Sequence, residues 1–97
     1  MALRVSDNPA ELRYELRDDR ELVGEIRYRA LPGALALVHT EVEPKRRGLG
    51  TEIVRGALDD LRERGLKVVP VCPFVAAFIR RHPEYADLVT ADDATPE

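Results

Sequence analysis

The chain has 97 residues, with 15 lysine and arginine residues against 18 aspartate and glutamate residues, so its formal net charge is −3 at pH 7. This length fits one small domain, residues 1–97, with one hydrophobic core. The acidic balance argues against a general nucleic-acid or membrane-surface binder, and no apolar run approaches the ~20 residues that span a membrane.

The first third of the chain alternates polar and apolar residues, which is typical of half-buried strands. We expect one strand over residues 11–17 and a second over residues 21–31. The polar segment 18–20 turns between them, so the two strands form an antiparallel hairpin. Both ends of the chain, residues 1–9 and 90–97, are expected to be irregular and frayed. The side chains predicted to point inward are Leu12, Tyr14, Leu16, Leu22, Ile26 and Tyr28.

A third strand is predicted over residues 34–43. Its first half is apolar on both faces, which favours a central strand that is covered on both sides. By the simple alternation of a strand, His39 and Glu41 are expected to lie on the same face as Leu35 and Leu37.

A long amphipathic helix is predicted from residue 49, and Gly65 suits its C-terminal end. Residues 67–71 are predicted to form a fourth strand, parallel to the third because a helix connects them. Pro70 cannot donate to a ladder, so we expect this strand at an edge of the sheet or splayed from its neighbour. A short second helix is predicted to begin at Pro73, since proline suits a first helical position.

The junction between the third strand and the long helix is Lys45-Arg46-Arg47-Gly48-Leu49-Gly50-Thr51. The first N–H groups of a helix have no intrahelical partner, and the helix dipole adds partial positive charge there. Glycines lack a Cβ atom, so the backbone can approach a ligand closely. These features make a seat for a phosphate group, although an ordinary helix start with a solvated basic turn has the same sequence.

This junction resembles the acetyl-CoA pyrophosphate loop of the GNAT superfamily of N-acetyltransferases, Gln/Arg-x-x-Gly-x-Gly/Ala, with Lys45 in the first position. A second segment, from Val71-Cys72-Pro73-Phe74 to Tyr85, resembles the C-terminal signature of very short, stand-alone GNAT-like proteins. The similarity covers roughly residues 10–89. It implies an α+β, truncated GNAT-like fold: a mainly antiparallel four-stranded sheet, a crossover helix and a short C-terminal helix.

The resemblance also implies a binding site for acetyl-CoA or CoA, and we expect no metal. The pyrophosphate would lie on the amides of residues 47–51, and the pantetheine arm along residues 41–42, where the third and fourth strands splay apart. Arg80 and Arg81 are candidates for the CoA 3′-phosphate, or they form a solvated helix end. The predicted cofactor-binding residues are Val42, Lys45, Arg46, Arg47, Gly48, Leu49, Gly50, Thr51, Phe78, Arg80 and Arg81.

The predicted catalytic residues are Cys72, His39 and Glu41. A thiol just before a helix N-terminus can have a lowered pKa, so Cys72 is an acetyl carrier, a residue lining the thioester site, or a buried structural cysteine. His39 is the candidate base that deprotonates the amine, and Glu41 is the alternative. Typical GNATs use a tyrosine to protonate the leaving thiolate. Ile79 takes that place here, which leaves Tyr85, water or no donor.

We therefore expect an acetyl-CoA-dependent N-acetyltransferase that acts on a primary amine of a protein, peptide or small molecule. One alternative is a non-catalytic CoA-binding or regulatory domain, favoured by the missing tyrosine, and a further one is a small nucleic-acid-binding module. A single cysteine and the lack of an apolar N-terminal segment suit a cytoplasmic protein. We expect a monomer or weak homodimer, with no membrane partner and an unidentified acceptor.

Overall fold

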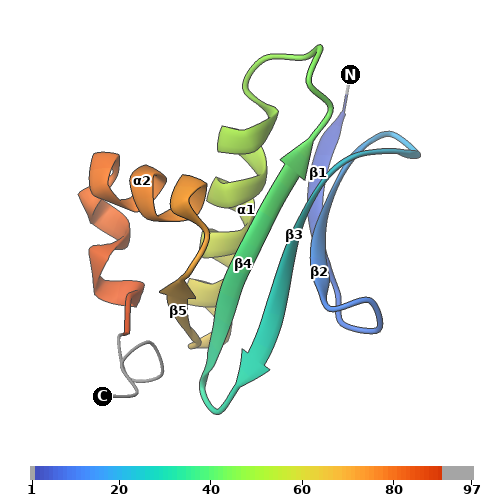
Figure 1. Ribbon diagram of the computed structural model, residues 1–97. Helices are drawn as coiled ribbons and strands as arrows, with labels where there is room; N and C mark the ends of the chain where they lie inside the picture. The colour runs from blue at the N-terminus through green and yellow to red at the C-terminus, as the bar shows by residue number, and fades with distance from the viewer. Residues whose placement is uncertain (1, 91–97) are drawn as a thin grey trace.

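The computed structural model describes residues 2–90, which form one five-stranded sheet with helices packed against it (Figure 1). The elements are β1 (Leu3–Asn8), β2 (Arg13–Asp18), β3 (Glu21–Leu31), β4 (Ala34–Val42), α1 (Leu49–Arg64), β5 (Lys67–Pro70), α2 (Pro73–Arg81) and the 3-10 helix η1 (Pro83–Leu88). The strand order is β1-β2-β3-β4-β5, and every neighbouring pair is antiparallel except β4–β5. The fold is thus α+β with a mainly antiparallel sheet, as predicted, but with five strands rather than four.

The extra strand is β1, which replaces the irregular N-terminal segment that the sequence suggested. β1 pairs with β2 along its whole length. Its Val5 packs against α1 at Gly56, where an added Cβ atom would lie only 2.5 Å from Val5 Cγ2. A glycine in a helix interior usually weakens the helix, but here it lets a strand approach. At the other end, the predicted fraying of residues 91–97 lies outside the described residues, and Thr90 donates its N–H to the Val68 carbonyl.

We expect Gly56→Ala to lower the free energy of unfolding by about 1 kcal/mol, because the cost of overpacking exceeds the gain in helix propensity. The Val5 Cβ atom is 2.6 Å from the new methyl position, too close for a side-chain rotation to relieve. Urea denaturation monitored by circular dichroism measures the change. Removing the clashing atoms should reduce this loss, so Gly56→Ala should cost less in a Val5→Gly background than in the wild type. If Gly56→Ala stabilises the protein, the close approach of β1 to α1 does not require a glycine at position 56.

The hydrophobic core lies between the sheet and α1, which contacts all five strands, while α2 lies beside α1 at the β5 end (Figure 1). Gly65, with φ 72°, ends α1 in the left-handed conformation that its sequence position predicted. No helix among residues 2–90 is long and apolar enough to cross a membrane. The fully buried core side chains of α1 and the sheet include Tyr14, Leu16, Ile26, Leu37, Ile53, Val54, Leu58, Leu61 and Val68.

A β-bulge in β3 changes which side chains reach this core. Leu16 pairs with Gly24 and Arg17 pairs with Leu22, so Val23 is an extra residue in β3. Beyond a bulge the alternation of faces is shifted by one residue. Val23 is therefore buried and Leu22 is 39% exposed, which makes the predicted inward position of Leu22 wrong.

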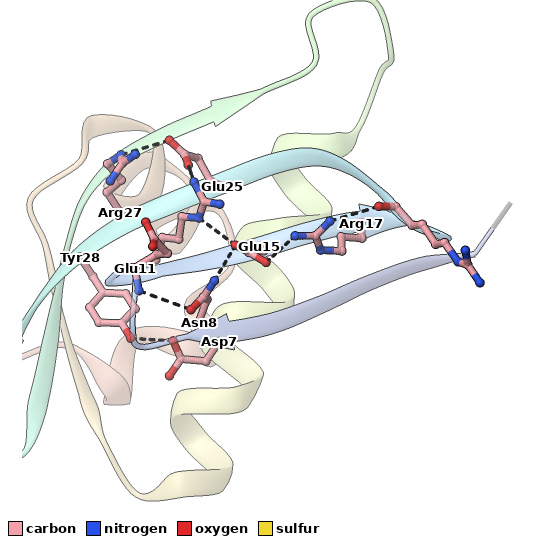
Figure 2. Close-up of polar contacts among 10 residues, drawn as sticks. Asp7, Asn8, Glu11, Glu15, Arg17, Glu25, Arg27 and Tyr28 are labelled. Atoms are coloured by element: carbon pink, nitrogen blue, oxygen red, sulfur yellow. Dashed lines mark hydrogen bonds and ion pairs between the residues drawn. The ribbon is translucent and has the colours of Figure 1, made fainter.

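The face of β2 and β3 opposite α1 carries a row of ion pairs, which we call the polar ladder (Figure 2). Glu15 lies at its centre and accepts hydrogen bonds from Arg13 and Arg17. Arg13 also donates to Glu25, and Glu25 accepts from Arg27. The ladder gives this part of the sheet a charged surface in place of a second layer of helices.

Candidate functional site

The turn before α1 has the geometry of an anion seat. Gly48 has φ 82°, a left-handed conformation that favours glycine. No side chain in the described part of the chain caps the N-terminus of α1, whose first internal hydrogen bond runs from the Glu52 N–H to the Gly48 carbonyl. The amide groups of the preceding residues, from Leu49 to Thr51, are therefore left for another acceptor.

This turn borders a hollow of about 350 Å³, the loop hollow, which also reaches the end of β4 and the start of α2. Its lining residues are Thr40, Val42, Arg46, Gly48, Leu49, Gly50, Thr51 and Phe74. Six of them belong to the predicted cofactor-binding set. Phe74 explains the second glycine of the motif, because a Cβ atom at Gly50 would lie 2.7 Å from the Phe74 ring.

The cationic residues of the turn differ in their surroundings. Arg46 donates to the Asp18 carboxylate at 2.8 Å, and this hydrogen bond holds the pKa of Asp18 below its usual value. Arg46 thus ties the turn to the end of β2. Lys45 and Arg47 are exposed to solvent, and the Lys45 N–H donates to the Glu43 carboxylate.

The strand β4 loses its β5 partner halfway along its length. The last pair joins Leu37 to Pro70, and from there to Val42 no strand of residues 2–90 lies on that side. The Glu43 N–H donates to β3, and the direction of backbone groups alternates along an antiparallel strand. Thr40 and Val42 therefore direct their N–H and C=O groups toward the open side. The pairing of the two strands ends here, and the backbone groups that face the open side belong to residues 40 and 42 rather than 41. Of these groups, the Thr40 N–H is engaged with the Cys72 sulfur.

Cys72 lies at the inner end of this open edge, in the N-cap position of α2. It is 5% exposed, its Sγ lies 3.4 Å from Thr40 Oγ1, and its N–H donates to the Leu37 carbonyl. Burial raises the pKa of the Cys72 thiol, but the hydrogen bond with the Thr40 side chain and the backbone N–H groups of Val75, Phe74 and Thr40 together outweigh this effect. The net effect is a pKa below the ordinary value, as the helix position predicted.

His39 and Glu41 do not lie on the face that the sequence predicted. Arg27 pairs with His39 and Tyr28 pairs with Leu37, so Val38 is an extra residue in β4. This bulge moves His39 and Glu41 to the face opposite Leu37. There they are exposed and lie beside each other, with His39 Nε2 3.6 Å from Glu41 Oε1. The structure does not bring them together with Cys72, which contacts the α1 side of the sheet.

The predicted contacts from α2 are also separated from the loop hollow. Phe78 is 1% exposed and stacks on His82 with ring centroids 4.1 Å apart, so it is a core residue rather than a lining residue. Arg80 and Arg81 are exposed at the C-terminal end of α2, about two turns from Phe74 at its beginning. Their assignment to the 3′-phosphate stays a prediction.

Two residues of the hollow were not predicted as site residues. One is Phe74, which is 39% exposed at the rim of the hollow. The other is Thr40, which unbroken alternation places on the face opposite His39 and Glu41, the predicted catalytic residues. Its true face depends on the bulge at Val38, and no residue type at that position announces a bulge.

Comparison with known proteins places the chain in a family. The family model for GCN5-related N-acetyltransferases matches residues 13–88. Among solved structures, the chain resembles the NMR solution structure of a GCN5-like protein from Staphylococcus aureus, with a TM-score of 0.65 and 21% sequence identity over 91% of this chain and 88% of that chain. No curated protein sequence matches. Because the family model covers well over half of its length, this chain belongs to the GCN5-related N-acetyltransferase family.

Proposed function

We propose that the protein is an acetyl-CoA-dependent N-acetyltransferase that moves an acetyl group to a primary amine. The observation that carries this proposal is the continuity of the loop hollow. It joins the uncapped N-terminus of α1 to the open edge of β4, and Thr40 at its inner end contacts Cys72. An elongated donor with an anionic end and a reactive end fits such a path.

Three parts of acetyl-CoA have a matching group in this path. The pyrophosphate would accept hydrogen bonds from the amides between Arg47 and Thr51. The pantetheine amides would pair with the Thr40 carbonyl and with the backbone of Val42, which point away from β3. The thioester would then lie near Thr40 and Cys72. Gly48 and Gly50 support this fit, since the first adopts a left-handed conformation and the second leaves room for Phe74.

The reaction would be direct attack of the neutral amine on the thioester carbonyl, with backbone N–H groups stabilising the developing oxyanion. An acceptor that approaches from the face opposite α1 would meet His39 and Glu41, which flank the same open stretch of β4. Either side chain could take the amine proton. We place this chemistry in the cytoplasm, where a single cysteine stays reduced.

Calorimetric titration with CoA and acetyl-CoA tests the binding step, and we expect one molecule of either to bind. Acetyl transfer to a panel of small amines and amine-bearing peptides then tests the reaction. Binding without transfer to any acceptor would support a non-catalytic CoA-binding domain, which the absence of a tyrosine at Ile79 also favours. No binding of either compound would overturn the proposal.

A route through acetyl-Cys72 is the variant of this mechanism. Incubation with acetyl-CoA alone, followed by intact-protein mass spectrometry, distinguishes the two routes. A mass increase that maps to Cys72 and disappears when amine is added would establish the two-step route. If no such adduct forms, direct attack of the amine on acetyl-CoA is the remaining route.

A further inference from the structure

The leaving thiolate of CoA needs a proton, and the structure narrows the groups that could supply it. Ile79 carries no acidic proton. The Tyr85 hydroxyl donates to the Asp59 carboxylate of α1 at 2.7 Å and is buried there, so it does not reach the loop hollow. At the inner end of the hollow, a hydroxyl group comes from Thr40, and behind it lies the thiol of Cys72 at 3.4 Å.

We propose that Thr40 and Cys72 form a proton relay, in which the Thr40 hydroxyl delivers the proton of the Cys72 thiol to the sulfur of the departing CoA. This inference rests on the proposed acetyl transfer and names the donor for its last step. Thr40 is placed to touch the donor because it lines the hollow. Cys72 acts through Thr40, since it is 5% exposed and does not line the hollow itself.

The tetrahedral intermediate collapses, the bond between the acetyl carbon and the CoA sulfur breaks, and its electron pair stays on that sulfur. The sulfur takes the Thr40 hydroxyl proton, while the Thr40 oxygen takes the proton of the Cys72 thiol. Cys72 is left as a thiolate and recovers a proton from solvent after CoA leaves. No oxidant, reductant or acetyl-enzyme intermediate is needed.

The environment of Cys72 suits this role. The thiolate would lie at the start of α2, where the N–H groups of Phe74 and Val75 and the helix dipole stabilise a negative charge. The free CoA thiol is in an ordinary aqueous environment, with a pKa near that of a model thiol, about 8.5. The Cys72 thiol has a pKa below its ordinary value, which eases transfer of its proton through Thr40 to the CoA thiolate. The bulge at Val38 is what turns Thr40 toward Cys72.

Thr40→Val removes the hydroxyl and keeps the branched shape that suits a strand. We expect it to lower kcat about tenfold or more, while the Kd for acetyl-CoA from calorimetry changes less than about twofold. Thr40→Ser should keep most of the activity. Cys72→Ala should lose about as much as Thr40→Val, and the double variant should be no worse than either, because the relay is broken only once.

Titration of the Cys72 thiolate by its ultraviolet absorbance gives a readout that needs no turnover. We expect Thr40→Val to raise the pKa of Cys72 by about half a unit or more, and Thr51→Val, on the other side of the hollow, to leave that pKa unchanged. Suppose that the wild type transfers acetyl groups. The relay alone is then overturned if Thr40→Val is equally active, or if the losses of the two single variants add in the double variant. An unchanged thiol pKa in Thr40→Val, or an acetyl adduct on Cys72 that passes to the amine, also overturns the relay. A wild type that binds acetyl-CoA but acetylates no amine overturns the proposed function itself.

Discussion

Gly48→Glu should weaken the binding of CoA and acetyl-CoA at least about tenfold. Gly48 lines the loop hollow directly before the first residue of α1, so its new carboxylate would lie where the diphosphate is expected. At the effective dielectric constant of a protein surface, repulsion between such charges costs roughly 1.5–3 kcal/mol, which is a factor of ten or more in Kd. Calorimetric titration of both compounds measures the effect.

Gly33 provides a matched control for this substitution. Gly33 and Gly48 both adopt left-handed conformations, with φ 72° and 82°, and neither has an atom within 4 Å of an added Cβ. Gly33 lies in the turn between β3 and β4, at the end of β4 opposite to the loop. Gly33→Glu therefore adds the same strain, about 1 kcal/mol, and the same charge, but should bind CoA like the wild type.

Gly48→Ala separates the two effects of the substitution. It strains the backbone as the glutamate does but adds no charge, so its loss of affinity should be the smaller of the two. Equal affinity in Gly48→Glu and Gly33→Glu would show that the turn before α1 does not receive a diphosphate. Equal loss in Gly48→Ala and Gly48→Glu would assign the effect to backbone strain.

The part of the site formed by one continuous segment was predictable from the sequence. The strand, the glycine turn and the helix start follow one another along the chain, and each has a local cause. Gly48 supplies the left-handed turn, the stripe of apolar residues from Leu49 onward defines α1, and Gly65 ends it. The Cys72–Pro73 pair likewise announces the N-terminus of α2, because proline suits the first helical position.

The parts that sequence reasoning missed depend on how strands pair. Alternation along one strand says which residues share a face only while the register is unbroken. The bulges at Val23 and Val38 break the register. Alternation that ignores them wrongly places Leu22 in the core and His39 on the face of Leu37. The predicted inward position of Leu12 is also wrong. Leu12 lies in the turn before β2 with φ 56°, outside the regular strand, and is exposed there.

The polar ladder is a second feature that alternation alone did not reveal. Glu15 is 4% exposed although it lies on the face of the sheet opposite α1. Its two carboxylate oxygens accept hydrogen bonds from Asn8, Arg13 and Arg17, which come from β1 and β2 (Figure 2). Cross-strand pairing brings Glu25 beside it, and Arg13 bridges the two carboxylates. A charge so enclosed is tolerated only because its partners surround it.

Glu15→Gln should lower the free energy of unfolding at pH 7 by about 1–3 kcal/mol, the usual range for hydrogen bonds to a charged group. The glutamine keeps the shape but accepts at one oxygen only, so Arg13 or Arg17 loses its acceptor. The hydrogen bond from Asn8, offset in part by burial, and those from Arg13 and Arg17 hold the pKa of Glu15 below its usual value. Urea denaturation by circular dichroism measures the change in stability.

The pH dependence of that change identifies its origin. A carboxylate with a depressed folded-state pKa stabilises the protein above its unfolded pKa, about 4.3, and this contribution is lost as the pH falls through the folded-state pKa. Asp18 and Asp87 also have lowered pKa values, so wild type and variant both lose stability in acid. The difference between them should shrink below about pH 4.

Glu41→Gln is the control for Glu15→Gln, because the Glu41 side chain is 72% exposed and faces Glu25 across the strands. Relief of that like-charge pair should leave stability unchanged or slightly higher. A Glu15→Gln variant as stable as Glu41→Gln at pH 7 would mean that the ladder covers the sheet without stabilising it.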